Sequence, residues 1–408
     1  MSRIAIIGAG ITGVTTAYAL AQRGFQVTVL ERHRYAAMET SFANGGQLSA
    51  SNAEVWNSTA TVLKGLRWML RRDAPLLLNP LPTWHKYSWM GEFLRQIPNY
   101  RANTIETVRL AIAAREHLFS IAARENIDFD LEQRGILHIY KNRKDFDAAT
   151  KVNALLREGG LERSPVTNDE IRTLEPTLQG EFHGGFFTPS DSTGDIHKFS
   201  RGLAQACVRH GVKFSYETEI TSIRQDVDAT FVIDVRREDE SFSTRFDQVV
   251  VCAGVKSREF AAMLGDHINV YPVKGYSITV CLDDEQSQRA APWVSLLDDS
   301  AKIVTSRLGP DRFRVAGTAE INGFNRDIRA DRIAPLIQWT RKYFPDAATS
   351  RVIPWAGLRP MLPSMLPKVG KGHRRGVFYN TGHGHLGWTL SAATAASVAD
   401  SIERSVSR

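Results

Sequence analysis

The sequence predicts an α/β (α+β) fold, in which parallel-sheet units from both ends of the chain are interleaved with a second domain on a mixed or antiparallel sheet. Three observations support this prediction. A strand pattern, a glycine loop and a helical pattern open the chain at 3–23, and the same succession closes it at 377–405. Between them, 271–321 is strand-rich. The 408 residues also exceed the length of one ordinary core.

The intervening elements follow from local pattern and from breaks at glycine and proline. After a strand at 27–30, the stretch 38–58 is rich in Gly, Asn and Ser and is expected to form mainly loop. Residues 59–125 are mainly helical, with breaks at prolines. The remaining predictions are strands at 135–140, 212–217, 230–237 and 246–254, turns near 309–311 and Gly317, and helices at 144–158, 197–210 and 331–343.

Composition narrows the class of protein. Hydrophobic residues make up 43% and charged residues 23%, as in globular enzymes. The formal charge of +7 suits an anionic ligand or an anionic membrane surface, and it does not argue for nucleic acid. Three cysteines without C-x-x-C spacing predict reduced, buried thiols. The apolar start breaks at Gly8 without a cleavage-type ending, so we expect a cytoplasmic protein.

The first motif is G-x-G-x-x-G, formed by Gly8, Gly10 and Gly13. It follows a strand, opens a helix and precedes Glu31 at the end of the next strand, which is the fingerprint of a Rossmann-like dinucleotide site. The first glycine permits the turn, the second admits a pyrophosphate, and the third lets helix and strand pack closely. The helix N-terminus offers N–H groups to the phosphates, and Glu31 can accept ribose hydroxyls.

The second motif, "YNTGHGHLGWTLSAATA" at 379–395, favours FAD over NAD. A nicotinamide has no need of a second strand, glycine loop and helix, whereas a flavin ring gains negative charge at N1 and O2 that a helix N-terminus stabilises. A third strand end, "QVVVCAGVKS", brings small residues Ala253 and Gly254 close to the cofactor. His383 and His385 have no acidic or cysteine partners in the motif, so we expect no metal.

Four further stretches carry a resemblance that extends along nearly the whole chain: "ETSFANGGQLSAS" at 39–51, "YPVKGYSIT" at 271–279, "WAGLRPMLP" at 355–363 and "NTGHGHLGWT" at 380–389. Together with the glycine motifs, they resemble the D-amino-acid oxidase and glycine oxidase family of FAD enzymes. The sequence is more similar still to bacterial D-amino-acid dehydrogenases of the small-subunit type. A group that acts on D-hydroxyproline or D-proline shares this plan, as do oxidases of the glycine or sarcosine type.

The resemblance implies a set of FAD contacts and a division of the chain. The FAD-binding domain would comprise 1–55, 145–260 and 350–408, and the substrate-binding domain 56–144 and 261–349. No histidine or cysteine lies in 39–51 and no cysteine follows Cys281, so we expect non-covalent FAD. The expected FAD contacts are Gly8, Gly10, Ile11, Thr12, Gly13, Glu31, Arg32, Ser41, Asn44, Gly46, Gln47, Leu48, Ile220, Ala253, Gly254, Gly382, His383, Gly384, His385, Leu386, Gly387, Trp388 and Thr389.

The substrate end is expected around Arg359, which matches the carboxylate-binding arginine of the family. A guanidinium can hold a carboxylate by two parallel hydrogen bonds. Tyr271 and Tyr276 are further substrate-binding candidates, and strand alternation places Lys274 and Tyr276 on one face and Tyr271 on the other. The implied reaction is hydride transfer from Cα of a D-amino acid to flavin N5, with no protein acid or base required. The imino acid then gives a 2-oxo acid and ammonia.

The electrons must pass to a quinone or another carrier in a dehydrogenase, or to oxygen in an oxidase. In "TATVLKGLRWMLRR", Val62, Leu63, Leu66, Met69 and Leu70 share one helical face, and Lys64, Arg67 and Arg71 the other. Such a helix can lie on an anionic membrane or pack on its own domain, and both interpretations stay open. The membrane interpretation would add peripheral contact with the inner membrane. The sequence also leaves open the oligomeric state and a role as one subunit of an electron-transfer complex.

Overall fold

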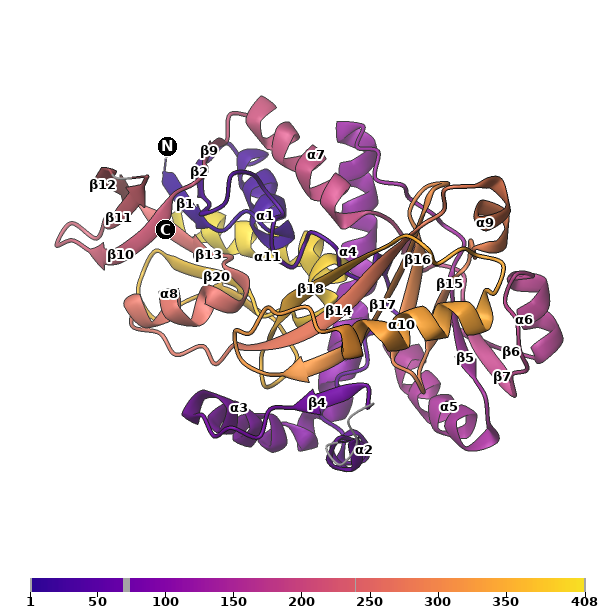
Figure 1. Ribbon diagram of the computed structural model, residues 1–408. Coiled ribbons are helices and arrows are strands. Elements are labelled where there is room, and N and C mark those ends of the chain that lie inside the picture. The colour runs from indigo at the N-terminus through magenta and orange to yellow at the C-terminus, as the bar shows by residue number, and fades with distance from the viewer. Residues whose placement is uncertain (1, 69–73, 239, 407–408) are drawn as a thin grey trace.

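The structure is a computed structural model that describes residues 2–68, 74–238 and 240–406. Two sheets organise the chain (Figure 1). The first has six strands, in the order β19 (Lys368–Lys371), β20 (Val377–Thr381), β13 (Gln248–Val251), β1 (Arg3–Ile7), β2 (Gln26–Leu30) and β9 (Lys213–Ser215). Its strands run parallel except at β19, which pairs antiparallel with β20. This is the Rossmann-like unit that the sequence predicts.

Both faces of the first sheet are buried, and its central strand β1 is apolar and buried from Ile4 to Ile7. Ile4 and Ile6 of β1 pack among the helices α1 (Ile11–Ala21), α4 (Tyr100–Glu125), α7 (Ile196–Arg209) and α11 (Gly387–Val406). Ala5 and Ile7 point to the other face, among α8 (Ser257–Met263) and the three-stranded sheet β10 (Glu219–Gln225), β11 (Phe231–Arg237) and β12 (Glu240–Phe246). The period of two along the strand thus divides one strand between two cores.

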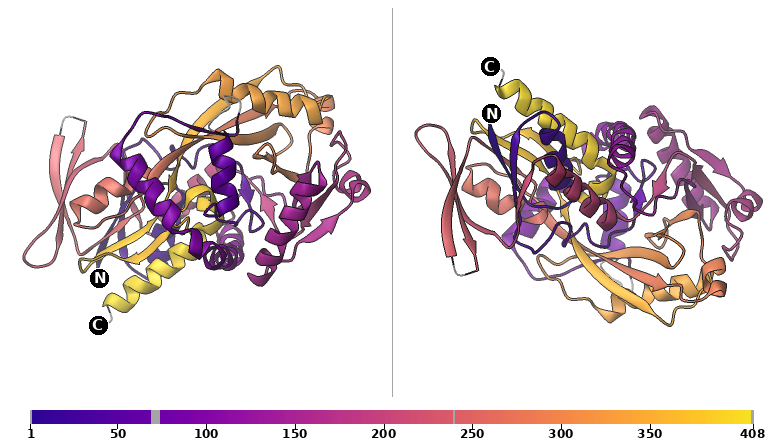
Figure 2. Two further views of the ribbon diagram at one scale, coloured as in Figure 1. Left: turned by 90° about the horizontal axis from the view of Figure 1, so that it is seen from below. Right: turned by 90° about the horizontal axis from the view of Figure 1, so that it is seen from above.

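The two ends of the chain meet in this sheet. β13 pairs with β1 on one side and with β20 on the other, so the opening and closing strands are separated by a single strand. Helix α1 packs against α11, and in both views of Figure 2 the N and C labels lie next to each other. The glycine loops that precede these two helices are therefore brought to the same edge of the sheet.

The second sheet has nine strands, of which β14 is central to the candidate site. Helix α10 (Ala330–Tyr343) covers one face of this sheet, where Leu336 and Trp339 pack against Ile278 and Val315. The strands are, in order, β18 (Val352–Met361), β14 (Tyr271–Cys281), β17 (Arg312–Ile321), β16 (Ile303–Arg307), β15 (Ser295–Asp298), β5 (Ile136–Tyr140), β7 (Gly184–Thr188) and β6 (Ser164–Val166), with β4 (Leu76–Leu78) beside β17.

Sheet membership differs from the predicted boundaries in two places. β6 and β7 fall in the predicted FAD-binding segment 145–260, and β18 falls in 350–408, yet all three pair into the second sheet. The prediction of a turn near Gly317 is also wrong, because this residue lies within the strand β17. A Cβ there would come within 2.8 Å of Ile303 and 3.1 Å of Leu336, so the glycine serves close packing. Local pattern shows a strand and does not show its partners.

The remaining helices and short strands lie in the stretch 59–125 and in the connections between the strands of the two sheets. The 59–125 stretch contains α2 (Thr59–Trp68), α3 (Trp84–Arg95), the 3₁₀ turn η1 (Ile97–Asn99) and α4, as its prolines predict. Met69, Leu70 and Arg71 of the predicted amphipathic face lie outside the described residues. The other elements are β3 (Gln47–Leu48), α5 (Arg143–Glu158), α6 (Asn168–Leu174), β8 (Ser192–Thr193), η2 (Gly254–Lys256), α9 (Glu285–Ala290) and η3 (Gly384–Leu386).

Candidate active site

A cavity of about 1210 Å³ extends from the glycine loops of the first sheet to β14 and β18 of the second. This volume exceeds that of most small-molecule pockets, and it leaves room for a dinucleotide and a further small molecule. Three strand ends supply its wall: the loop after β1, the 3₁₀ turn after β13 and the loop after β20. They lie at the carboxyl edge of the parallel strands, where open α/β sheets bind ligands.

The loop after β1 has the geometry of a phosphate cradle. Gly8 has φ +99°, and a Cβ there would lie 2.9 Å from the carbonyl oxygen of Cys252. A Cβ on Gly13 would lie 1.9 Å from the Gly8 carbonyl oxygen, so only glycine lets α1 pack so closely on the strand. The first amide of α1, on Ile11, donates to the Ser41 hydroxyl at 3.1 Å. Glu31 accepts from the amide of Ala9 at 2.7 Å, beside the loop.

The loop after β20, the start of α11 and β3 bring polar atoms without described partners to the cavity. Gly382 and Gly384 have φ +77° and +59°, and α11 begins at Gly387 with its free N–H groups at the cavity wall. In the described structure, the Gln47 Oε1, His385 Nδ1 and Trp388 Nε1 atoms are buried and have no hydrogen-bond partner. Buried polar atoms normally have partners. A ring with donors and acceptors on its edge, as in FAD, fits this set.

The two histidines of this loop are held neutral. His383 Nε2 lies 3.0 Å from the Thr394 hydroxyl, and His385 Nε2 lies 3.2 Å from the Asn52 carbonyl oxygen. Burial lowers the pKa of His383 to about 3 and that of His385 to about 4. Trp56 stacks on the His385 ring with 4.9 Å between centroids. Their positions give polar, uncharged surface near the expected flavin.

Most of the residues predicted to contact FAD line this one cavity. Gly13 and Leu48 do not: Gly13 has the packing role just described, and Leu48 is 2% exposed in the core beneath β3. The predicted residues in the wall are Gly8, Gly10, Ile11, Thr12, Glu31, Arg32, Ser41, Asn44, Gly46, Gln47, Ile220, Ala253, Gly254, Gly382, His383, Gly384, His385, Leu386, Gly387, Trp388 and Thr389.

Arg359 lies in the same cavity, on β18 opposite Val273 of β14. Its guanidinium forms no hydrogen bond or ion pair with any residue that the structure describes, and burial alone lowers its pKa to about 10. It therefore stays protonated at neutral pH without a protein counter-ion. A desolvated cation in this position is stabilised by an anionic ligand. The geometry fits the predicted role in binding a carboxylate.

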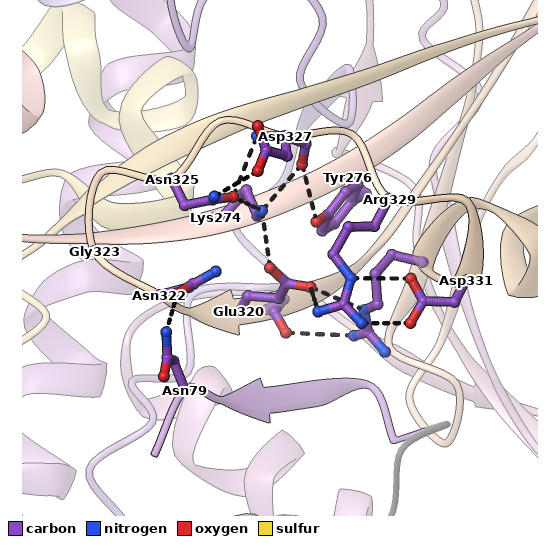
Figure 3. A network of polar contacts seen from close by, with 12 residues as sticks. Asn79, Lys274, Tyr276, Glu320, Asn322, Gly323, Asn325, Asp327, Arg329 and Asp331 are labelled. Carbon is purple, nitrogen blue, oxygen red and sulfur yellow. Dashed lines mark hydrogen bonds and ion pairs between the residues drawn. The ribbon is translucent and has the colours of Figure 1, made fainter. Parts of the chain in front are cut away.

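The two predicted tyrosines point elsewhere, to the segment 322–329 that joins β17 to α10. Tyr276 borders the cavity, but its hydroxyl donates to the Asp327 carbonyl at 3.4 Å, on the face of β14 that also carries Lys274 (Figure 3). Tyr271 lies outside the cavity wall, and its hydroxyl accepts from the Gly323 amide at 3.0 Å. The two rings belong to different apolar clusters, as alternation predicts, and both hydroxyls pair with the backbone of the 322–329 segment.

Sequence analysis missed a polar wall opposite the glycine loops. The His138 Nε2 atom lies 2.9 Å from the Ser51 hydroxyl, and burial holds the pKa of His138 well below its usual range. The Tyr100 hydroxyl donates to Glu54 at 2.6 Å. These residues come from distant segments, and the one sequence signal was a histidine inside the apolar strand "GILHIY". The wall comprises Ser51, Glu54, Tyr100, His138, Tyr140, Arg163, Asp299 and Lys302.

Comparisons with known proteins agree with this arrangement. A model of the DAO family, described as FAD-dependent oxidoreductase, matches residues 3–401. The chain is 63% identical over 399 residues to D-amino acid dehydrogenase 3 of Mesorhizobium japonicum, covering 98% of this chain and 96% of that protein. It is 39% identical over 411 residues to the D-amino acid dehydrogenase of Paramagnetospirillum magneticum, covering 98% and 94%.

Solved structures show the same fold at low sequence identity. Glycine oxidase from Geobacillus kaustophilus aligns with a TM-score of 0.75 at 23% identity, covering 99% of this chain and 95% of that one. L-Proline dehydrogenase from P. horikoshii aligns with a TM-score of 0.75 at 16% identity, covering 99% and 93%. Family model, relatives and fold agree, and the chain belongs to the DAO family of FAD-dependent oxidoreductases.

Proposed function

We propose that this protein is an FAD-dependent D-amino-acid dehydrogenase that oxidises its substrate to an imino acid, which water converts to a 2-oxo acid and ammonia. The observation that carries the proposal is the guanidinium of Arg359, which pairs with no described residue and shares its cavity with two glycine loops and two helix N-termini. The names of the two relatives above support the choice of D-amino acids.

Different residues of the cavity would bind the cofactor and the substrate. The Gly8 loop and the N-terminus of α1 would hold the pyrophosphate of FAD, and the N-terminus of α11 would face its ring. When bound, FAD supplies the two-electron acceptor for the C–H bond that is oxidised. Arg359 would bind the substrate carboxylate and fix its orientation. His383 and His385 are neutral at pH 7 and take no proton from the substrate amine.

We infer that FAD is bound without a covalent link. The 39–51 segment, which carries the cavity residues Ser41, Asn44 and Gln47, has no histidine or cysteine. Cys252 borders the cavity, but burial raises the pKa of its thiol to about 12, so it is not a thiolate nucleophile at neutral pH. Denaturation with acid should therefore release all of the yellow cofactor into the supernatant. Flavin absorbance that stays with the precipitated protein would contradict this inference.

Anaerobic bleaching of the bound FAD tests the proposed function directly. The purified protein is mixed with D- and L-forms of alanine, phenylalanine, glutamate and lysine, and with glycine, sarcosine, D-proline and cis-4-hydroxy-D-proline. We expect rapid bleaching by D-amino acids and none by their L-forms. Bleaching only by the proline compounds, or only by glycine and sarcosine, would show that these are the substrates in place of D-amino acids in general. Bleaching by none of the compounds would refute the proposal that the protein oxidises amines.

We further propose that the electron acceptor is a quinone, reached by peripheral contact with a membrane. Among the described residues, no helix is long and apolar enough to cross a bilayer. Helix α3 lies at the lower edge of Figure 1. Its exposed side chains Trp84, Tyr87 and Leu94 fall on one helical stripe. Trp84 is 82% exposed, and Leu81 just before the helix is 67% exposed. Aromatic and apolar residues of this kind insert at a membrane interface.

Substituting Leu81 and Trp84 together by serine should abolish binding to vesicles. The two side chains are among the most exposed apolar groups in the described chain, and we expect them to enter the lipid headgroup region. Serine at both positions removes this apolar surface and with it the free energy of insertion. The measurement is co-sedimentation with vesicles of phosphatidylcholine and phosphatidylglycerol. The control is Phe242→Ser, an exposed residue of β12, which lies at the left edge of Figure 1 and apart from α3.

Turnover with a water-soluble dye should be the same for both variants and the wild type, because neither surface lines the cavity. Wild-type protein that stays in the supernatant, or equal sedimentation of all three proteins, would contradict the membrane contact. Oxygen uptake as fast as quinone reduction would contradict the choice of acceptor.

A further inference from the structure

The motifs "YPVKGY" and "WAGLRP" each contain a glycine that the proposed function does not use. Gly275 of β14 and Gly357 of β18 are directly opposite each other in the antiparallel pairing, and both line the cavity. Facing residues in such a pair have Cα atoms only about 4.5–5.5 Å apart. The two glycines therefore leave a continuous gap in the side chains on the cavity face of the sheet.

The guanidinium of Arg359 fills one half of this gap. A Cβ built on Gly275 would lie 2.3 Å from Arg359 Cζ, 2.3 Å from Nη2 and 2.4 Å from Nη1. A point at nearly equal distance from these three atoms lies off the plane of the group, so a face of the guanidinium covers it. The guanidinium thus lies over the Gly275 backbone, in the space that a side chain at this position would take.

The indole of Trp355 fills the other half. A Cβ on Gly357 would lie 2.0 Å from Trp355 Cη2, 2.6 Å from Cζ2 and 2.8 Å from Cζ3. These are the atoms of the six-membered ring, which therefore covers the Gly357 backbone. Because Gly357 faces Gly275, the ring lies beside the guanidinium on the same surface. An apolar neighbour on that side keeps water from the carboxylate that the guanidinium would bind.

We propose that Gly275 and Gly357 are positioning residues, which let Arg359 and Trp355 lie flat and side by side as the floor of the substrate-carboxylate site. The inference rests on the proposed function, because it concerns the carboxylate of the amino-acid substrate. Neither glycine has a positive φ, so the backbone at these positions does not itself demand glycine. Glycine is required because the Arg359 side chain occupies the space above Gly275 and the Trp355 side chain that above Gly357.

Gly275→Ala should weaken carboxylate binding without loss of FAD. The methyl group pushes the guanidinium off the sheet and breaks its alignment, so we expect KM for D-alanine to rise about 10- to 100-fold. The affinity for propionate, measured by its perturbation of the flavin spectrum, should fall by a similar factor. D-Alaninamide has no carboxylate, and its kcat/KM should be unchanged.

A double-mutant cycle separates positioning from a merely structural role. With Arg359→Ala, the group that clashes is absent, so adding Gly275→Ala should change neither kcat/KM for D-alanine nor the thermal midpoint. If Gly275→Ala alone does not fold, this double variant should fold. Gly91→Ala is the control, since a Cβ there meets no heavy atom within 4 Å and α3 lies outside the cavity.

Two outcomes would overturn the inference: an unchanged KM and propionate affinity in Gly275→Ala, or an equal effect of Gly275→Ala with and without Arg359. Wild-type protein that oxidises no amino acid would instead refute the proposed function. The propionate affinity and the thermal midpoints of the cycle would still test the glycine pair in that case.

Discussion

Replacing Arg359 with alanine should lower kcat/KM for D-amino acids by roughly 10²- to 10⁴-fold while the protein keeps its FAD. The reason is that a guanidinium can make two charge-assisted hydrogen bonds to a carboxylate, each of about 1.5–3 kcal/mol, and a factor of ten corresponds to about 1.4 kcal/mol. Because no described residue pairs with this cation, no protein carboxylate is left unpaired by the change. The loss should therefore appear in catalysis and not in folding.

The measurement compares steady-state turnover of a soluble dye with the flavin absorbance of the same preparation. Arg359→Lys should recover only a part of the activity, since an ammonium lacks the planar fork. Arg351→Ala is a matched control: this arginine precedes β18, is exposed and pairs with Asp283 on the surface. Its kinetics should equal those of the wild type. An Arg359→Ala enzyme with normal kcat/KM would remove the carboxylate site from this part of the cavity.

The cofactor site could be predicted from sequence because its requirements are local. Gly13 is demanded by its contact with the Gly8 carbonyl inside one strand–loop–helix unit, and Gly8 has a positive φ of +99° in the turn of that unit, so both requirements arise from residues near in sequence. We could also infer that the strand–loop–helix units at the two ends of the chain lie close together, because one FAD molecule needs a site for its pyrophosphate and another for its flavin ring. Leu48 shows the limit of this prediction, since it was expected to contact FAD but its side chain turns into the core where the chain enters β3.

The substrate end was predicted less well because it depends on strand pairing between distant segments. Alternation placed Lys274 and Tyr276 on one face of a strand, but it could not show that α10 and the 322–329 segment cover that face. The hydroxyl that sequence analysis offered to a substrate instead meets Asp327. Gly275, which lies between the two, faces the cavity, and its importance appears only when Arg359 of another strand is placed across it.

The second large effect is expected on stability, from the buried ion pairs of Glu320 on the face of β14 that carries Lys274. Glu320 of β17 is 2% exposed and lies between two cations without exposed surface, at 2.9 Å from Lys274 Nζ and 3.7 Å from Arg332 Nε (Figure 3). Lys274 also donates to the Asn325 side chain at 2.6 Å and to the Asp327 carbonyl at 3.1 Å. One carboxylate thus balances two buried charges that hold β14, α10 and the 322–329 segment together.

Glu320→Gln should lower the free energy of unfolding of the holoprotein by about 3–5 kcal/mol, the usual effect of leaving buried charge without its partner. The substitution keeps the shape of the side chain and removes only its charge. Chemical denaturation, followed by FAD release and by far-UV circular dichroism, measures the change. Lys274→Met in the same chain should restore part of the loss, because it removes one of the two cations that need a counter-ion.

Asp331→Asn is the matched control for Glu320→Gln. Asp331 also pairs with an arginine of this network, Arg329, but both side chains are about half exposed. Water and salt screen such a pair, so its loss should cost no more than about 1 kcal/mol. If Glu320→Gln proved as stable as Asp331→Asn, the buried carboxylate would not be the counter-ion of Lys274 and Arg332. The register of β14, and with it the floor that carries Arg359, would then be held by the apolar core beneath α10.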